Sequence, residues 1–501
     1  SVTRIIIAGI GVLIQIIWVV VLLMRLNEYS QIITLLTVAI ELVLVLAVYS
    51  MDTNAAFKLP WIILITVAPI VGICVFFLFG RSGATKKVRA RYRKIDQQLF
   101  AYLDQDEQII EELSKKDERL ANDFKYLWKC ASSPVYKNTD VKYYGDTCDA
   151  MAAQLEDMMQ AKKFIFLEYH AIEMAESFQA LRKVLMAKAR EGVEIRILYD
   201  DAGCIGFLNP RFIKYMESMG IQCRVFNPIM PVLNIFMNNR DHRKITVIDG
   251  KVAYTGGYNL ADEYFNITHP YGQWKDSGIR FEGDAVQTAT ILFLEMWNAL
   301  REQDVDIEKY LPVYPYKAKE QGFFALYGDS PLDKEPAGEN VYMNLLRHAK
   351  KYIYFTTPYL ILSDEMTREL TGAAKRGVDV RIITPGIPDK KTIFQVTKSY
   401  YPQLLKHGVK IYEYTPGFMH EKQCICDGEI VVVGTINLDF RSLYLHFENA
   451  ALFCGYEAVS HVKEDFDALF PICKDMSKEP SERTRRLRLS QLILRLFSPL
   501  M

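Results

Sequence analysis

The chain has 501 residues, of which 50% are hydrophobic and 24% are charged, and its 60 basic residues balance 60 acidic ones. This length predicts more than one domain. The zero formal net charge excludes a global electrostatic field as a basis for nucleic-acid binding. Nine scattered cysteines without zinc-ligand spacing predict reduced, mostly buried thiols in a cytosolic setting.

The first eighty residues contain three apolar runs, at 5–24, 32–49 and 61–79. Each is close in length to the ~20 residues that a bilayer core requires, which predicts two to three membrane spans. A basic cluster after the third run predicts that this end lies on the cytoplasmic side, next to anionic lipid: Arg81, Lys86, Lys87, Arg89, Arg91, Arg93 and Lys94. We therefore expect a multi-pass protein of the cell membrane whose remaining domains are cytoplasmic.

Residues 95–129 are rich in charged residues and leucine and contain neither proline nor glycine, which predicts a helical connector. The remainder alternates strand-like and helix-like segments, which indicates an α/β fold. In the tail, arginines alternate with apolar residues from 483 to 497. A basic amphipathic helix of this kind lies on an anionic membrane surface or packs against the protein's own core.

The pattern His-x-Lys-x4-Asp occurs twice in the soluble part of the chain. Its copies are 178 residues apart (420 − 242), and the same interval separates two later asparagines. Flanking helix–glycine–strand segments also match, which predicts two similar half-domains, each a mixed sheet flanked by helices. We expect them to face each other across a pseudo-twofold axis and to form one shared site.

The expected organisation has five parts. Residues 1–80 form the transmembrane anchor, and 81–130 form the basic juxtamembrane segment and connector. The two half-domains follow at 131–320 and 321–478, and 479–501 form the basic amphipathic tail.

Two histidines and two lysines in one pocket are suited to chemistry at a phosphodiester. One imidazole attacks phosphorus while the other, protonated, donates to the leaving oxygen, and the lysines stabilise charge on the phosphoryl oxygens. This chemistry needs no cofactor or metal, and no histidine or carboxylate cluster has metal-ligand spacing. The predicted catalytic set consists of the six motif residues: His242, Lys244, Asp249, His420, Lys422 and Asp427.

Residues after each motif are predicted to bind the substrate, because amide groups can donate further hydrogen bonds to the phosphoryl oxygens. This set is Gly257, Asn259, Thr435 and Asn437. The motif aspartates, Asp249 and Asp427, each precede a glycine. We expect them to hold the turn after a strand rather than to touch the substrate.

A histidine that acts as a base needs an acceptor on its other nitrogen, so that the correct tautomer faces the phosphate. Two carboxylates are candidates for this orienting role. Asp276 follows His242 by 34 residues, and Glu448 follows His420 by 28.

The two motif copies, with Gly256–Asn259 after the first and Gly434–Ser442 after the second, resemble the paired HKD motifs of the phospholipase D superfamily. Within it the chain is most similar to bacterial-type cardiolipin synthases, a likeness that extends to several further segments: Asn239-Arg240-Asp241, Asp262-Glu263-Tyr264, Trp274-Lys275-Asp276, Thr357-Pro358-Tyr359 and Phe447-Glu448-Asn449. The resemblance implies transfer of a phosphatidyl group from one phosphatidylglycerol to another. Glycerol is released, and cardiolipin forms through a phosphohistidine intermediate.

By the same resemblance, His242 would be the nucleophile and His420 the acid and then the base. The implied partners are phosphatidylglycerol and cardiolipin, with no nucleic acid, while a homo-oligomer stays open. Two departures stand out: family members often carry Asn at the position of Asp241, and Glu421 introduces a carboxylate within the second motif. We expect Glu421 to alternate away from the pocket, although a negative charge near His420 could raise the pKa of that histidine. The alternatives are a phospholipase D-type hydrolase, a phosphatidyltransferase with another acceptor lipid, a membrane-tethered nuclease and a non-catalytic scaffold.

Overall fold

The computed structural model describes residues 13–18, 28–77, 86–209, 211–228, 238–302, 304–479, 487 and 489–500. These residues belong to two compact units. The anchor unit takes its described residues from 1–87, 229–239 and 488–501, and the catalytic unit takes its own from 88–228 and 240–487.

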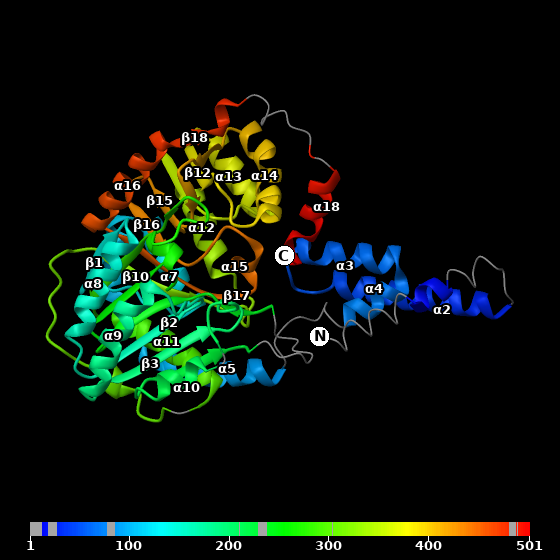
Figure 1. Cartoon of the computed structure of the whole chain (residues 1–501). Helices are drawn as coiled ribbons and strands as arrows, with labels where there is room; N and C mark the ends of the chain where they lie inside the picture. Colours follow the sequence, from blue (N-terminus) through cyan, green and yellow to red (C-terminus); the bar gives the residue numbers. More distant parts are fainter. Residues whose placement is uncertain are drawn as a thin grey trace. The chain divides into compact units, whose positions relative to one another are not determined.

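The anchor unit consists of apolar helices (Figure 1). They are α2 (Glu28–Tyr49), α3 (Ala55–Val67), α4 (Pro69–Val75), α18 (Leu489–Phe497) and the 3₁₀ turn η7 (Ser498–Leu500). Among the described residues, one helical stretch, Gln31–Tyr49, is long and apolar enough to cross a membrane, with a mean hydropathy of 2.6. The first predicted run falls largely outside the described residues, which here include only 13–18.

The third predicted run is two short helices rather than one span-length helix. Ala68 separates them with φ −137° and ψ 74°, and Pro69 begins α4, because proline suits the first turn of a helix and disfavours the α conformation in the residue before it. The two helices then pack closely, since a Cβ at Gly72 would lie 2.5 Å from the carbonyl oxygen of Leu64.

In the tail, most of the predicted arginines lie outside the described residues. The described helix α18 contacts α3. Gln491 of α18 is buried, whereas Leu489, Leu492 and Ile493 are exposed. The helix therefore packs within the anchor unit and leaves apolar side chains uncovered, so its attachment to a membrane surface stays a prediction.

The predicted helical connector is broken into several helices instead of one. They are α5 (Lys86–Leu99), the 3₁₀ turn η2 (Phe100–Tyr102), α6 (Glu107–Lys116) and α7 (Glu118–Ala131). Asp106 and Asp117 cause the later breaks, because each side chain caps a new helix by accepting backbone N–H bonds.

The first half-domain of the catalytic unit is a mixed seven-stranded sheet in the order β1-β9-β7-β6-β2-β3-β4. Its strands are β1 (Thr139–Tyr144), β2 (Phe164–Tyr169), β3 (Glu194–Asp200), β4 (Gln222–Phe226), β6 (Lys244–Ile248), β7 (Val252–Gly256) and β9 (Gly278–Gly283). Its helices are α8 (Thr147–Met159), α9 (Glu176–Arg190), α10 (Phe212–Glu217) and α11 (Val286–Leu300), with 3₁₀ turns η3 (Asp262–Phe265) and η4 (Glu308–Tyr310).

The second half-domain repeats this strand order as β10-β17-β16-β15-β11-β12-β13, with β18 added at the edge. The strands are β10 (Phe323–Asp329), β11 (Tyr352–Thr356), β12 (Asp379–Pro385), β13 (Lys410–Tyr414), β15 (Gln423–Cys426), β16 (Ile430–Gly434), β17 (His446–Cys454) and β18 (Cys473–Asp475). The helices are α12 (Ala337–His348), α13 (Asp364–Lys375), α14 (Lys391–Lys406), α15 (Phe440–Tyr444) and α16 (Glu457–Leu469), with 3₁₀ turns η5 (Phe470–Ile472) and η6 (Met476–Lys478). The predicted α/β fold with two similar halves is confirmed.

The two halves exchange short strands in a symmetric way. In the first half, β5 (Arg240–Asp241) pairs in parallel with the start of β17, and in the second half, β14 (Gly417–Met419) pairs in parallel with β8 (Gln273–Lys275). Because β5 and β14 precede equivalent motifs, each half inserts its motif against the other half. This reciprocity is what an approximate twofold axis produces.

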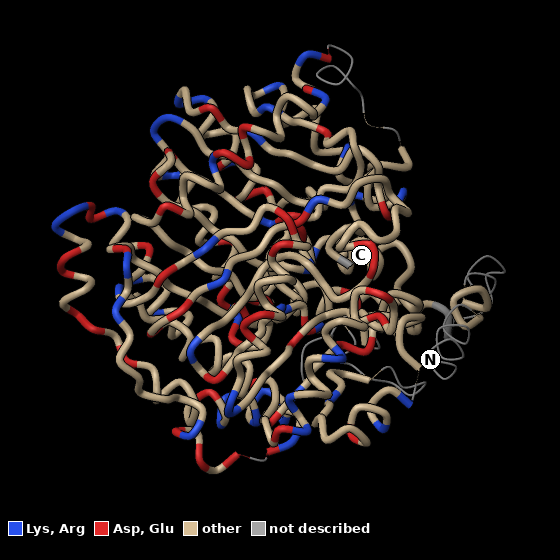
Figure 2. The backbone as a smooth tube through the Cα atoms, turned by 60° about the vertical axis from the view of Figure 1, so that its left-hand side comes forward, with Lys and Arg blue, Asp and Glu red and all other residues tan. Residues whose placement is uncertain are grey.

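Helix α11 lies between the two halves, with contacts to β2, β6 and β9 of the first sheet and to β10 of the second. Nearly all of its residues are buried, including the Trp297 side chain, so the helix is packed on all sides. In Figure 1 the first half occupies the lower part of the catalytic unit and the second half the upper part. Figure 2 shows basic and acidic residues mixed along this unit.

Candidate active site

Both motif histidines lie at the exchange between the halves. His242 follows β5, and its backbone N–H donates to the carbonyl oxygen of Phe447 on β17 at 2.9 Å. His420 follows β14, and its N–H donates to the carbonyl oxygen of Lys275 on β8 at 2.8 Å. Each histidine is therefore fixed by the backbone of the opposite half.

The two predicted orienting carboxylates contact the histidines crosswise. His242 Nδ1 lies 2.8 Å from Glu448 Oε2, and His420 Nδ1 lies 2.5 Å from Asp276 Oδ2. Each carboxylate thus serves the histidine of the other half, not the one it follows in sequence. The reason is the strand exchange, which puts Asp276 and Glu448 directly after the backbone groups that hold the opposite histidine. With Nδ1 engaged, Nε2 is the nitrogen left for chemistry on each ring.

The motif lysines are buried beside the histidines. Lys244 Nζ donates to the carbonyl oxygen of His242 at 2.7 Å, and Lys422 Nζ contacts the carbonyl oxygen and Nδ1 of His420. Burial lowers the pKa of Lys244 to about 8 and that of Lys422 to about 7. Each lysine also lowers the pKa of the opposite half's histidine, so the two motifs form one electrostatic site.

Both histidines favour the neutral form while no anion is bound. Burial, reinforced by Lys244, lowers the pKa of His242 well below its usual range. Burial and Lys422 lower the pKa of His420 to about 3, against the opposing effect of Asp276. A site with buried lysine charge and neutral histidines is suited to bind an anionic substrate.

The motif aspartates lie at the opposite ends of their strands from the histidines. Asp249 and Gly250 both have positive φ, as do Asp427 and Gly428, which is the type I′ hairpin geometry favoured by Asp-Gly. Each carboxylate accepts three backbone N–H bonds from the start of a neighbouring strand, in the first half from Lys162, Lys163 and Phe164. Both aspartates thus hold a turn.

The predicted substrate-binding residues have different surroundings. Thr435 Oγ1 donates to Glu448 Oε2 at 2.5 Å, and a Cβ at Gly257 would lie 2.1 Å from Asp276 Oδ1. Both residues therefore lie against the orienting carboxylates. The Asn259 amide accepts from the backbone of Ala171 and donates to Tyr264, while the buried Asn437 Oδ1 makes no hydrogen bond within the described part of the chain.

Comparison with known proteins gives this geometry its context. Residues 155–297 and 342–470 match the family described as "Cardiolipin synthase, PLD-like domain". The chain belongs to this family of the phospholipase D superfamily. Membership identifies it as an enzyme of the phosphatidyltransferase class.

Relatives cover most of the chain. A cardiolipin synthase from Halalkalibacterium halodurans is 32% identical over 88% of this chain and 87% of its own length. An uncharacterized protein from Streptococcus mutans is 39% identical over 92% of this chain and 99% of its own length. Among solved structures, phosphatidylserine synthase from Haemophilus influenzae matches 72% of this chain and 93% of its own, with a TM-score of 0.56 and 13% identity, which shows a shared fold.

The two histidines of this family member have unequal neighbours. His242 lies between two further imidazoles, with ring centroids 5.0 Å from His170 and 5.5 Å from His446. His420 instead lies among aromatic rings, 5.0 Å from Trp274 and 5.2 Å from Tyr264. The twofold relation pairs Trp274 with His446, since both precede an orienting carboxylate by two residues.

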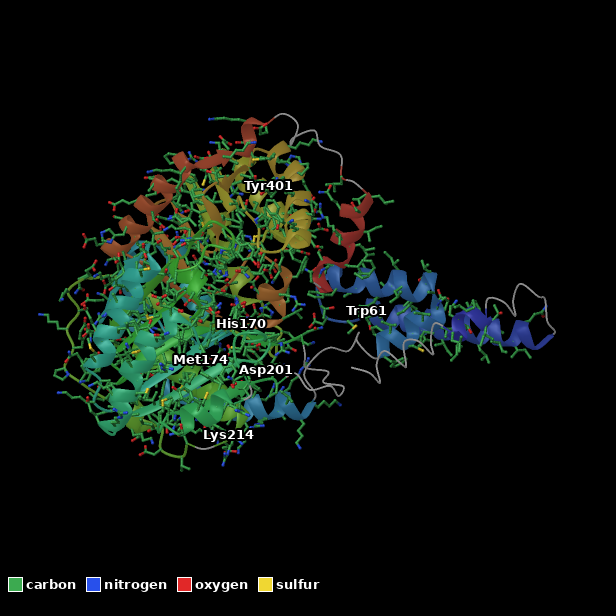
Figure 3. All side chains as sticks on the ribbon, in the orientation of Figure 1. Trp61, His170, Met174, Asp201, Lys214 and Tyr401 are labelled. Carbon is green, nitrogen blue, oxygen red and sulfur yellow. The ribbon has the colours of Figure 1, made fainter. Side chains whose placement is uncertain are left out.

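His170 and His446 were missed in the sequence. His170 directly follows the strand β2, at the edge where a site is expected, and His446 stands two residues before Glu448. Figure 3 labels His170 within the catalytic unit, near the junction of its two halves. Their positions at strand ends were the available signal, but neither belongs to a repeated motif.

The middle residue of each motif forms a buried ion pair behind its histidine. Arg243 Nη1 lies 2.8 Å from Glu295 Oε2, and Glu421 Oε1 lies 2.8 Å from Lys275 Nζ. Glu421 is thus paired with Lys275, and the pKa of His420 is lowered by burial and by Lys422 rather than raised. These pairs tie each motif to the neighbouring framework.

Proposed function

We propose that this enzyme is a cardiolipin synthase, which transfers the phosphatidyl group of one phosphatidylglycerol to a hydroxyl group of a second and releases glycerol. The observation that carries the proposal is the crossed pairing of His242 with Glu448 and His420 with Asp276. This pairing leaves the Nε2 atoms of two buried imidazoles available for chemistry, next to two lysines. These are the groups that a double displacement at a phosphodiester requires.

In the first displacement, Nε2 of His242 attacks phosphorus. The P–N bond forms, and the P–O bond to glycerol breaks. Glu448 stabilises the imidazole as positive charge develops on it, while Lys244 and Lys422 stabilise the charge on the phosphoryl oxygens. The proton on His420 Nε2 passes to the glycerol oxygen, and the lipid stays attached as a phosphatidyl-histidine.

In the second displacement, a hydroxyl group of the incoming phosphatidylglycerol attacks phosphorus. His420, now neutral, takes the hydroxyl proton. The new P–O bond forms as the P–N bond breaks, so His242 is released unchanged and His420 regains its proton.

His242 is the better nucleophile because of its surroundings. Two imidazoles and two lysines disfavour a positive charge on His242, so its nitrogen lone pair stays available. His420 is flanked by the π faces and edges of Trp274 and Tyr264 and by the carboxylate of Asp276, which can stabilise an imidazolium. An anionic phosphodiester supplies the remaining charge that raises the pKa of His420 on binding.

The burial of the site favours a lipid acceptor over water. The side chains of His242 and His420 are only 10% and 9% exposed. We further propose that the apolar helix Gln31–Tyr49 anchors the enzyme in the cell membrane, with additional apolar runs making it multi-pass. The basic residues of α5 then place the catalytic unit on the cytoplasmic side.

The test is to incubate the purified full chain with glycerol-labelled phosphatidylglycerol in mixed micelles, without other lipids. Equal amounts of cardiolipin and free glycerol are expected. Phosphatidic acid as the main product would make the enzyme a hydrolase, and a requirement for phosphatidylethanolamine would change the acceptor.

A second experiment assigns the histidines. An artificial phosphatidyl ester of p-nitrophenol needs no acid to expel its leaving group, so His420→Asn should still release a burst of nitrophenol and accumulate a covalent lipid adduct on His242. The matched variant His242→Asn should give neither. A burst from His242→Asn but not from His420→Asn would reverse the assignment.

A further inference from the structure

The imidazole of His446 has no function in the proposed reaction, although it lies within the active site. Its side chain is 11% exposed, and neither ring nitrogen makes a hydrogen bond within the described part of the chain. His446 Nδ1 is 3.5 Å from Glu448 Oε1, and Glu448 also contacts His242. Two imidazoles therefore converge on one buried carboxylate.

These side chains have the composition of a transition-metal site. One potential ligand atom from each of His242, His446 and Glu448 lies within 4.8 Å of the others. Two histidines and a carboxylate form a typical three-ligand set for zinc, with a fourth position left for water. Imidazole nitrogen suits zinc and cobalt, whereas magnesium and calcium prefer oxygen ligands.

The other half of the same site provides an internal comparison. There the twofold relation places Trp274 where His446 stands, so His420 and Asp276 face an indole without a metal-binding lone pair. The histidine–carboxylate pairs of the two halves match, but a third potential ligand, His446, is present only beside His242.

We propose that His242, His446 and Glu448 bind a divalent transition-metal ion of the zinc type, and that this ion reversibly inhibits the enzyme. Binding through Nδ1 of His242 displaces the proton now held between His242 and Glu448, and this proton moves to Nε2 of the neutral ring. Zinc bonds of about 2.1 Å separate tetrahedral ligands by about 3.4 Å, so the 2.8 Å contact between His242 and Glu448 opens slightly.

The inhibitory effect rests on the proposed function, but metal binding does not. A bound dication withdraws electron density from His242 and removes Glu448 as its partner, so the nucleophile weakens.

The experiment measures binding by the visible absorption of Co²⁺, a spectroscopic substitute for zinc, added to the detergent-purified full chain. We expect one tetrahedral Co²⁺ per chain, displaced by Zn²⁺ and not by Mg²⁺. His446→Gln should weaken binding at least about 100-fold, since even outer partners of metal ligands contribute 10–100-fold. The matched variant His420→Gln should bind as the wild type does, although it loses catalysis.

Transferase assays complete the test. Zinc should inhibit the wild type with the affinity seen by spectroscopy, and a chelator should restore activity.

Wild-type-like Co²⁺ binding by His446→Gln, or no tetrahedral Co²⁺ in the wild type, would overturn the site. If His446→Gln does not fold, His446→Asn has the same expected result, and the stoichiometry and tetrahedral spectrum of Co²⁺ bound to the wild type test the site without substitution. Cobalt binding together with cardiolipin formation that zinc leaves unchanged would overturn inhibition alone.

Discussion

Glu448 Oε2 lies 2.8 Å from Nδ1 of His242, a residue 206 positions earlier in the chain and in the other half-domain. The equivalent contact joins Asp276 to His420 in the opposite direction. Because each half supplies the orienting group of the other, neither half contains a complete catalytic pair. The duplicated fold is therefore a functional unit only when both halves are assembled.

The crossed pairing predicts which step each carboxylate affects. Glu448→Gln should slow formation of the covalent intermediate, because it leaves His242 without an anionic partner, by about 10²–10⁴-fold. Asp276→Asn should slow the release of poor leaving groups by a similar factor and spare the nitrophenol burst. Rapid-quench assays with both substrates distinguish the two effects. Equal loss of the burst in both variants would contradict the crossed roles.

Gly257 should tolerate no side chain. A Cβ there would lie 2.1 Å from Asp276 Oδ1, so Gly257→Ala must displace the carboxylate that orients His420. We expect kcat to fall about 100-fold with little change in KM, since orientation rather than binding is lost. The control is Gly372→Ala on the helix α13, where the nearest atom would be 3.9 Å away and activity should persist.

Thr435 should act through Glu448, to which its hydroxyl donates at 2.5 Å. Thr435→Val keeps the shape but removes this bond, so we expect activity to fall about 10–100-fold, as for other groups that orient a catalytic residue. Thr435→Ser keeps the hydroxyl and should retain most activity. A similar loss in both variants would indicate that packing of the methyl group matters instead.

The buried lysines predict an alkaline limit for activity. The pKa of Lys422 is lowered to about 7 and that of Lys244 to about 8, and the cationic form exists below these values. The charge that binds the phosphodiester is therefore lost as the pH rises through 7 to 8, and kcat/KM should fall. Lys422→Arg keeps its charge at all accessible pH values. Its profile should therefore lose the lower of these two steps, although its absolute rate will differ.

The ion pair between Glu421 and Lys275 predicts a stability effect. Glu421 is fully buried and Lys275 is 14% exposed, and Lys275 also contacts Asp465 at 2.8 Å. Lys275→Met leaves two carboxylates without their cation and should destabilise the catalytic unit by about 3–5 kcal/mol. Adding Glu421→Gln should recover part of this loss. Thermal unfolding monitored in detergent compares both variants with the wild type.

The sequence by itself determined the features that depend on local order. The repeated His-x-Lys-x4-Asp pattern, its constant spacing and the flanking helix–glycine–strand segments predicted two similar halves, and the motif residues led to the family. These features can be recognised in the sequence alone because a strand, a turn and the histidine–lysine spacing within a motif are each defined by neighbouring residues.

Only the tertiary structure shows which carboxylate contacts which histidine. Sequence distance pointed to Asp276 for His242 and to Glu448 for His420, whereas the exchange of β5 and β14 reverses these pairs. The partner of Glu421 and the imidazoles beside His242 were likewise hidden, because they come from strands far away along the chain. Contacts across a twofold interface depend on how two folded half-domains face each other, and a local sequence pattern does not predict that arrangement.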